Sequence, residues 1–481
     1  MKVLYVASEA VPFAKTGGLA DVAGSLPKAL KAEGVDVRVI MPKFGKIPEK
    51  FRNAMEHVYD GEIPVSWRSK YVGLDKIEHD GVTYYFVDNE EYFRREGFYG
   101  YGDDAERFSF FCRAVLNLLP AMDFWPDVIH TNDWHSGLVN VLLKLEHQGD
   151  ERYEKIRTLY TIHNLKYQGV FPKDVMSDVL GLDWKYFNNG DLEFYDAVNF
   201  MKGGLIYADY ISTVSKTYAK EIQYEYFGEH LDGLLRSRQD TLFGIVNGID
   251  YDIWNPWTDP MLHTNYDITN VLPRKKENKR ALQEELGLWQ DDHKFVIGLV
   301  SRLTNQKGLD LVNAIMPQIV DEHTQVVVLG TGDRLYEDAF RYYENAYRGN
   351  VCSSIMYDEG RAHRIYAGAD AVLVPSQFEP CGLTQLIGMH YGTIPIVRET
   401  GGLKDTVQPH NEFTHDGNGF TFDRYDAGLL LDAINRAKTF YFTNRYCCDE
   451  MVQRDMDKNV SWENSAWQYR NLYLELTRDK T

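Results

Sequence analysis

Short apolar runs alternate with amphipathic segments along this chain of 481 residues, and the alternation occurs in two separate series. This pattern is typical of βα units, which build a parallel sheet covered by helices. The predicted strands of the first series are Lys2–Ala7, Val35–Met41, Asp127–His130, Thr158–His163, Tyr210–Val214 and Phe243–Val246. Those of the second series are Phe295–Val300, Gln325–Leu329, Val351–Met356, Ala371–Val374 and Ile394–Val397. The alternation predicts two α/β domains, in agreement with a length that exceeds most single hydrophobic cores.

A segment with glycine and proline punctuation and no periodicity lies between the two series. It contains Asn247-Gly248-Ile249-Asp250 and Trp254-Asn255-Pro256-Trp257. Such a segment indicates an interdomain connection. We therefore expect a first domain at residues 1–246, a connection at residues 247–273 and a second domain at residues 274–460. Apolar residues at helical spacing predict a terminal helix over Trp462–Thr477.

The composition argues against several classes of protein. A formal net charge of −19 disfavours general nucleic-acid binding, which needs a basic face. No apolar run approaches the roughly 18 residues of a membrane span, and the run Val3–Ala7 is too short for a secretory signal. Five cysteines, an odd number without metal-site spacing, do not form a disulfide framework. We expect a reduced, cytoplasmic protein without a membrane or nucleic-acid partner.

Two glycine-bearing turns each follow a predicted strand and precede a predicted helix. The first is Lys15-Thr16-Gly17-Gly18, and the second is Glu379-Pro380-Cys381-Gly382. Such a turn lets the backbone approach a phosphate, and the following helix N-terminus attracts the anion. One turn of this kind can be a tight corner beside an exposed lysine. Two of them, one in each predicted domain, suggest a ligand held between the domains.

Two cations surround the turn after the first strand of the second domain. They are Arg302 and Lys307 of Ser301-Arg302-Leu303-Thr304-Asn305-Gln306-Lys307-Gly308. These side chains could be solvated, or they could neutralise a diphosphate at the carboxyl end of the strand. Gly330-Thr331-Gly332-Asp333 is a further phosphate-style turn, although Gly-x-Gly alone is more often a simple βα corner.

Polar clusters end two strands of the first domain, at His130-Thr131-Asn132-Asp133-Trp134-His135 and Thr161-Ile162-His163-Asn164-Leu165. They could be capping networks, and a metal site is disfavoured because no third ligand is evident. An Asp-x-Asp string could hold a divalent metal ion. The two such strings, Asp250-Tyr251-Asp252 and Asp455-Met456-Asp457, lie in polar stretches and are expected to be accidental.

Together, these motifs resemble those of the bacterial glycogen synthase and plant starch synthase family of retaining glucosyltransferases. The resemblance extends from Lys15-Thr16-Gly17-Gly18-Leu19 through Arg302 and Lys307 to Glu379-Pro380-Cys381-Gly382-Leu383-Thr384-Gln385. It implies a GT-B architecture, with two Rossmann-like domains facing across a cleft. It also implies that the terminal helix, residues 461–481, crosses back to the first domain.

The activity implied by the resemblance is transfer of glucose from ADP-glucose to the 4-hydroxyl at the non-reducing end of an α-1,4-glucan, with retention of configuration. No cofactor and no metal are expected. The implied catalytic residues are Glu379, Lys307, Arg302, Lys15 and His163. The implied donor-binding residues are Lys15, Gly17, Gly18, Arg302, Lys307, Gly332, Tyr357, Cys381, Gly382, Leu383 and Thr384. The implied acceptor-side residues are Asp133, Asn164 and Asp21, with a loop at Tyr92–Phe111.

Two other interpretations stay open at this point, and a third, a dehydrogenase, is set aside. A sucrose- or trehalose-type enzyme shares the architecture, but Ile387 stands where many such relatives carry a second glutamate. An inactive glucan-binding scaffold would be expected to lose the cations or Glu379. A dehydrogenase would need Gly-x-Gly-x-x-Gly with an acidic residue about 20 positions on, which neither glycine turn has. UDP-glucose is also open as the donor. No motif supplies an obvious carboxylate nucleophile for a double displacement, so front-side departure of the leaving phosphate is the alternative.

Overall fold

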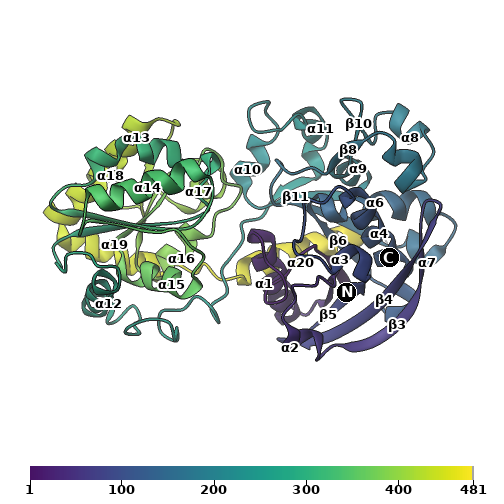
Figure 1. The fold of residues 1–481 in the computed structure, drawn as a ribbon, viewed down its shortest axis with the longest axis horizontal. Coiled ribbons are helices and arrows are strands. Elements are labelled where there is room, and N and C mark those ends of the chain that lie inside the picture. Colours follow the sequence, from purple (N-terminus) through teal and green to yellow (C-terminus); the bar gives the residue numbers. More distant parts are fainter. Residues whose placement is uncertain (479–481) are drawn as a thin grey trace. The chain divides into compact units, whose positions relative to one another are not determined.

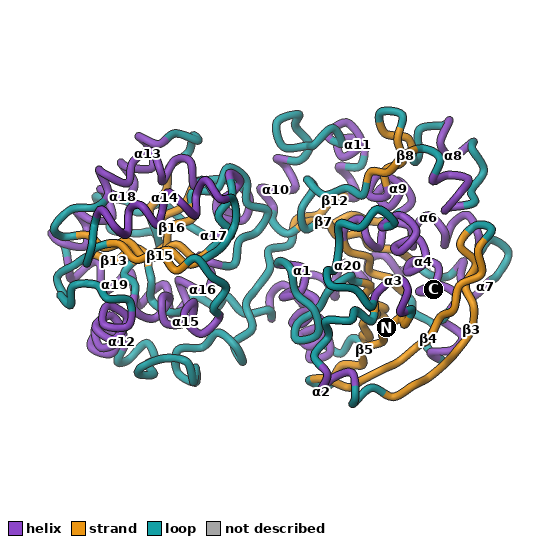
Figure 2. Tube along the Cα trace, in the orientation of Figure 1, coloured by secondary structure: helices purple, strands orange, loops and turns teal. Residues whose placement is uncertain are grey.

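The computed structural model describes residues 1–478, and the chain divides into two compact units. Unit 1 comprises Met1–Val214, Ala219–Ile245 and the residues from Trp462 onward, whereas unit 2 comprises Ser215–Tyr218 and Val246–Ser461. Each unit contains a sheet with helices packed against it (Figure 1, Figure 2). The predicted fold class of two α/β domains with parallel sheets is confirmed.

Unit 1 is built on a nine-stranded sheet of order β12-β11-β7-β6-β1-β2-β5-β4-β3. Its parallel part contains β1 (Lys2–Val6), β2 (Asp36–Pro42), β5 (Val82–Asp88), β6 (Val128–Asn132), β7 (Arg157–Ile162), β11 (Tyr210–Thr213) and β12 (Leu242–Gly244). An antiparallel extension contains β3 (Glu56–Val65) and β4 (Arg68–His79). A small separate sheet contains β8 (Val170–Pro172), β9 (Glu193–Phe194) and β10 (Ala197–Asn199).

The first long helix of unit 1, α1 (Gly18–Ala32), ends just before a glycine, Gly34. Gly34 has a φ of 81°, in the left-handed region that glycine tolerates without steric cost. Its N–H donates to Lys31 O and that of Val35 donates to Leu30 O, both at 3.0 Å. This paired bonding closes a helix C-terminus in the Schellman arrangement.

The other unit 1 helices are mostly short and connect the strands. They are α2 (Glu49–Arg52), α3 (Glu90–Phe93), α4 (Asp104–Asn117), α5 (Leu119–Met122), α6 (Asp133–Glu146), α7 (Glu151–Glu154), α8 (Lys185–Asn188), α9 (Phe200–Tyr207) and α11 (Asp232–Ser237), with a π-helical turn at Met176–Leu180 and a 3-10 turn at Gln239–Thr241. Helix α10 (Lys216–Glu221) begins in residues assigned to unit 2. No helix in the described residues is long and apolar enough to cross a membrane.

The terminal helix, α20 (Glu463–Thr477), packs within unit 1 against α1, β6 and β7. Tyr473 OH lies 2.6 Å from Nδ1 of His130, and the Tyr469 ring centroid lies 5.4 Å from that of His130. His130 is fully buried at the centre of the sheet. The last helix therefore completes the core of the domain in which the chain begins.

Unit 2 contains a six-stranded parallel sheet of order β15-β14-β13-β16-β17-β18. The strands are β13 (Phe295–Val300), β14 (Thr324–Leu329), β15 (Val351–Ser354), β16 (Ala371–Val374), β17 (Ile394–Arg398) and β18 (Phe420–Phe422). The helices are α12 (Val271–Glu285), α13 (Leu309–Ile319), α14 (Arg334–Ala346), α15 (Glu359–Gly368), α16 (Thr384–His390), α17 (Gly401–Thr406), α18 (Ala427–Thr443) and α19 (Arg445–Asp457), with a 3-10 turn at Asn305–Lys307. Most buried apolar residues of the sheet and the helices form one large core. A small separate cluster contains Val374, Val397, Leu403 and Val407.

The segment at residues 247–273, which we expected to connect the domains, packs into unit 2 instead. Asp259 is buried, and its Oδ2 lies 2.6 Å from His363 Nδ1 and accepts a 2.5 Å bond from Tyr391 OH. Trp254 stacks on His363 with ring centroids 3.9 Å apart. Helix α12 also begins at Val271, before the expected boundary. Glycine and proline punctuation shows where regular structure stops, but it does not show what the irregular segment packs against.

Candidate active site

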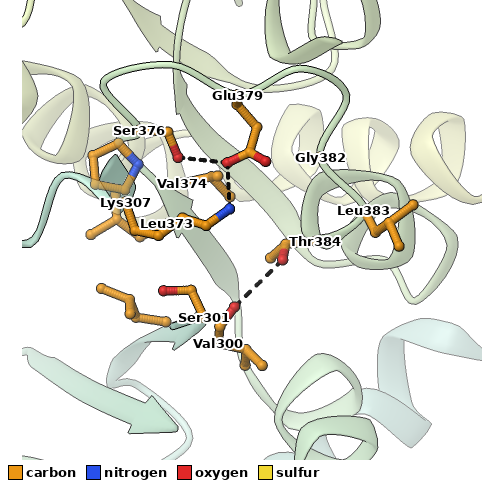
Figure 3. Close-up of a pocket in the computed structure, with 12 residues that line it drawn as sticks. Val300, Ser301, Lys307, Leu373, Val374, Ser376, Glu379, Gly382, Leu383 and Thr384 are labelled. Atoms are coloured by element: carbon orange, nitrogen blue, oxygen red, sulfur yellow. Dashed lines mark hydrogen bonds and ion pairs between the residues drawn. The ribbon is translucent and has the colours of Figure 1, made fainter. Parts of the chain in front are cut away.

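Unit 2 has a pocket at the carboxyl ends of β13 and β16 (Figure 3). These two strands are neighbours, and the strand order reverses between them, since β14 and β15 lie on one side and β17 and β18 on the other. Ligands of open α/β sheets bind at such switch points. The pocket is lined by Leu299, Val300, Ser301, Lys307, Leu373, Val374, Pro375, Ser376, Glu379, Gly382, Leu383 and Thr384.

A charged pair forms the polar centre of this pocket. Lys307 Nζ lies 2.8 Å from Glu379 Oε2, and Ser376 Oγ donates a 2.8 Å bond to the same oxygen (Figure 3). Glu379 is only 7% exposed, so its carboxylate depends on these partners. The structure thus brings together two predicted site residues that are 72 positions apart in the chain.

Lys307 reaches the pocket because its turn packs closely against the end of β16. Gly308, the next residue, has a φ of 77°, and a Cβ there would lie 2.1 Å from Pro375 O. The carbonyl of Gln306 accepts the N–H of Gln377 at 2.9 Å. Only glycine fits this close approach. Gly308 therefore determines the position of the backbone from which the Lys307 side chain extends. Arg302, at the start of the same turn, is exposed.

Hydrogen bonds from Gly402 and Gln385 hold the second glycine turn in place. The N–H of Gly402 donates to Glu379 O at 3.1 Å, and Gln385 Nε2 donates to the carbonyls of Cys381 and Gly382 at 3.0 and 2.9 Å. Thr384 then begins α16, whose first-turn amides lack partners inside the helix. Gly382, Leu383 and Thr384 line the pocket, as a donor-binding role requires.

Cys381 belongs to this turn but is not suited to nucleophilic chemistry. Its side chain is buried, and burial raises the pKa of its thiol to about 12. A thiol with this pKa stays protonated at neutral pH, whereas the thiolate is the nucleophile.

Four predicted donor-binding residues of unit 2 lie outside the lining of this pocket, namely Arg302, Cys381, Gly332 and Tyr357. The N–H of Gly332 donates to Glu337 Oε1 at 3.0 Å, and a Cβ at Gly332 would lie 2.3 Å from Leu303 O. The Gly-x-Gly turn is therefore required for close packing against the Arg302 turn. Tyr357 follows β15 and is 79% exposed.

In unit 1, predicted site residues follow β1, β6 and β7, which are adjacent in the sheet. Lys15 follows β1, and its Nζ lies 2.9 Å from Asp21 Oδ1 in α1. Asp133 follows β6, and His163 with Asn164 follows β7. Strand order also reverses at β1, so this edge is the switch point of unit 1.

Asp133 and His163 are held by a partly buried hydrogen-bond network. Oδ1 of Asp133 accepts the N–H of His163 at 2.8 Å, and His163 Nε2 lies 2.8 Å from Asn132 Oδ1. Burial raises the pKa of Asp133 to about 7 and lowers the pKa of His163 to about 3. The imidazole is therefore neutral near pH 7. Asn132, which positions it, was present in the polar cluster but was not singled out from the sequence.

The first glycine turn already contacts a negatively charged side chain, that of Glu9. The carboxylate of Glu9 accepts the N–H groups of Thr16 and Gly17 at 2.8 and 3.2 Å. The Gly17 amide already donates to a protein carboxylate, and the donor-binding role of Gly17 stays a prediction. The sequence motifs give no role to Glu9. A carboxylate directly after a buried strand was the available signal.

Neither Asp-x-Asp string forms a metal site in this structure. Asp250 Oδ1 accepts the N–H of Asp252 at 2.9 Å, a local turn bond, and Asp455 is buried in α19. Within residues 1–478, no group of three or more His, Cys, Asp or Glu side chains is placed to hold a metal ion.

Comparisons with known proteins identify the family. The family model described as starch synthase catalytic domain matches residues 2–237, and that of glycosyl transferases group 1 matches residues 286–441. A glycogen synthase from Anoxybacillus flavithermus is 51% identical over 476 residues, covering 99% of this chain and 98% of the relative. The chain belongs to the glycogen and starch synthase family of glycosyltransferases. A second glycogen synthase, from Caldicellulosiruptor saccharolyticus, is 51% identical over 478 residues and covers 99% of this chain and all of the relative.

Solved structures agree with this family. The catalytic domain of starch synthase IV from Arabidopsis thaliana, bound to ADP and acarbose, superposes with a TM-score of 0.91 at 33% identity, covering 99% of both chains. A sucrose-phosphate synthase from Thermosynechococcus elongatus gives a TM-score of 0.62 at 19% identity, again over 99% of both chains. The second likeness shows the shared fold alone. The family predicted from the motifs is thus confirmed.

Proposed function

We propose that this glycosyltransferase moves glucose from ADP-glucose to the 4-hydroxyl at the non-reducing end of an α-1,4-glucan, with retention of configuration. Relatives about 50% identical over the whole chain are named glycogen synthases. The Arabidopsis starch synthase holds ADP and acarbose, a nucleotide and an oligosaccharide analogue, which supports a nucleotide-sugar donor and a glucan acceptor.

The observation that carries the proposal is the Lys307–Glu379 pair at the switch point of unit 2. In our proposal, Glu379 holds donor sugar hydroxyls, while Lys307 and Arg302 neutralise the departing diphosphate. The backbone at Gly382 to Thr384 approaches the donor from the second glycine turn. Preorganised charges of this kind stabilise a leaving group because they do not have to reorganise during the reaction.

Unit 1 is proposed to bind the acceptor and to complete the charge on the donor. Lys15 contributes a mobile cation for the phosphates. Asp133, Asn164 and Asp21 are proposed acceptor contacts. His163, whose low pKa keeps it neutral, can exchange hydrogen bonds with a sugar hydroxyl without adding charge beside the reacting carbon.

Front-side departure is the mechanism that this arrangement favours. Glu379 Oε2 already takes bonds from Lys307 and Ser376, which weakens that oxygen as a nucleophile. We propose that the leaving phosphate oxygen takes the proton of the acceptor hydroxyl as the new glycosidic bond forms. Positive charge then comes from Arg302, Lys307 and Lys15, so we propose a reaction that needs neither a divalent metal nor a cofactor. A cytoplasmic location stays a prediction from composition.

Product analysis tests this function. The protein is incubated with ADP-glucose, a short maltooligosaccharide and EDTA, and early products are followed by proton NMR and digestion with an exo-acting α-1,4-glucosidase. We expect an α-linked product, one glucose longer, that the glucosidase degrades completely. A β-linked or glucosidase-resistant product, or turnover that appears only when magnesium replaces EDTA, would contradict the proposal.

A further inference from the structure

We infer that Glu9 is a positioning residue for the transfer reaction, because it holds the Lys15 turn and links this turn to the Tyr99 loop. The inference rests on the proposed function, since it takes Lys15 as a donor contact. It concerns a side chain to which the sequence motifs give no role. Its basis is a set of hydrogen bonds that converge on one buried carboxylate.

Glu9 lies at the carboxyl end of β1 and is only 4% exposed. Its Oε2 accepts bonds from the backbone N–H and the hydroxyl of Thr16, at 2.8 and 2.7 Å. Its Oε1 accepts the N–H of Gly17 at 3.2 Å. These three bonds hold the two residues that directly follow Lys15. The backbone that carries the Lys15 ammonium is therefore anchored from inside unit 1.

Glu9 also lies beside the N-terminus of α1, which has no capping side chain of its own. The N-cap residue of this helix is Gly17, which has no side chain to accept an amide bond. A carboxylate beside a helix N-terminus satisfies free N–H groups and interacts favourably with the helix dipole. Because Glu9 occupies this position, the amides of Thr16 and Gly17 are not offered to a donor phosphate. The Lys15 side chain is then the group through which this turn meets the donor.

The same carboxylate connects the turn to the proposed acceptor side. The segment Tyr92–Phe111, expected to be an acceptor-side loop, includes parts of α3 and α4, and Tyr99 lies between these two helices. The Tyr99 hydroxyl lies 2.8 Å from Ser8 Oγ and 3.4 Å from Glu9 Oε2. Ser8 is fully buried. Glu9 thus lies between the turn that carries the donor lysine and the loop expected to meet the glucan. A change at Glu9 should disturb both substrates, whereas Tyr99→Phe should mainly disturb the acceptor.

The burial of this carboxylate is costly unless its bonds are kept. Burial raises the pKa of Glu9, and the bonds from Thr16, Gly17 and Tyr99 oppose that shift. A buried carboxylate without such partners would lose far more free energy. The geometry of the turn and the charge of Glu9 are therefore mutually dependent, and removal of the side chain leaves a vacancy shaped for a small carboxylate.

The test compares Glu9→Ala with a matched control, Asp209→Asn. Asp209 is also a unit 1 carboxylate, and its Oδ2 accepts the N–H and hydroxyl of one threonine, Thr158, at 2.8 and 3.1 Å. It lies outside the Lys15 turn. We expect Glu9→Ala to lower kcat/KM for ADP-glucose about 100-fold, the scale of a displaced reacting group. Sodium formate, against sodium chloride of equal ionic strength, should restore about 10-fold of this loss by filling the vacancy. Asp209→Asn should keep the activity of the parent protein, and formate should not change that activity.

Each result decides the inference. Activity of Glu9→Ala within about threefold of the parent protein would overturn it, and so would a loss that formate does not restore and that Asp209→Asn shares. If Glu9→Ala does not fold, Glu9→Gln decides instead, and an unchanged kcat in folded Glu9→Gln overturns the inference. Failure of the proposed function is distinguishable, because the parent protein would then show no transfer in the same assay.

Discussion

Replacing Lys307 by methionine removes the ammonium group from the unit 2 pocket while it keeps the length of the side chain. The Lys307 and Glu379 side chains are 19% and 9% exposed, and their charged atoms lie 2.8 Å apart. At an effective dielectric constant of about 20, this separation corresponds to a gross attraction of about 6 kcal/mol. Desolvation offsets most of it, and hydrogen bonds to charged groups contribute about 1.5–3 kcal/mol net. We expect Lys307→Met to lower the free energy of unfolding by about 2 kcal/mol.

The effect on catalysis should be larger. Loss of one preorganised contact to developing charge costs about 10²–10³ in kcat, or about 2.7–4 kcal/mol. Glu379→Gln should lower kcat by a similar factor, because Lys307 Nζ directly contacts the Glu379 carboxylate. Groups that act as a unit are not additive, so the double variant should be about as slow as the slower single variant. If the two groups acted independently, the losses in kcat of the single variants would multiply to about 10⁴–10⁶.

Initial rates of labelled-glucose transfer and urea unfolding curves measure these two quantities. Lys438→Met is the matched control, since Lys438 Nζ pairs with Asp321 at 2.6 Å in the same unit but does not line the pocket. The control should lose some stability and keep its kcat. The reasoning would be refuted by a folded Lys307→Met protein with kcat within about threefold of the parent, or by additive losses in the double variant.

Three further predictions concern single side chains. Asp455 is 1% exposed, neither of its carboxylate oxygens has a hydrogen-bond partner among the described residues, and burial raises its pKa well above the usual range. The folded protein then keeps this proton to a higher pH than the unfolded chain, so the free energy of unfolding falls as pH rises above about 4. Asp455→Asn should therefore gain more melting temperature at about pH 8 than at about pH 5, and equal gains would contradict the argument. Cys381→Ser should stay within about threefold of the parent kcat, because the buried thiol stays protonated; a loss of about 10² would return Cys381 to the chemistry. Gly332→Ala should lower thermal stability through the clash with Leu303 O, whereas a rise in KM for ADP-glucose without a change in melting temperature would indicate direct donor contact.

Continuous apolar runs made the parallel strands predictable. Strands buried on both faces, such as Phe295–Val300 and Ala371–Val374, have the predicted bounds. The antiparallel strands β3 and β4 were missed because most of β3 is exposed and both strands carry many charged residues, which hides the strand pattern. Strand β5 was also missed, although its run Tyr84-Tyr85-Phe86-Val87 is buried and carried the signal. The three-residue strand β18 is too short for any periodicity.

The candidate site was predictable in its residue types but not in its partners. Lys307 and Glu379 were both chosen from turn position, yet their direct contact depends on the adjacency of β13 and β16, which strand order along the chain does not reveal. The glycines also looked alike in sequence. Gly382 lies in the pocket, whereas Gly332 serves packing against Leu303 and Gly17 donates to Glu9. Only tertiary structure separates these uses, because each requires knowledge of what the backbone approaches.

The most direct test of the central claim is transfer of labelled glucose to glycogen, with ADP-glucose and UDP-glucose compared side by side in EDTA. We expect transfer from ADP-glucose at a rate well above that from UDP-glucose. Transfer mainly from UDP-glucose would contradict the donor assignment. The absence of transfer from either donor by folded protein would contradict the proposed function itself.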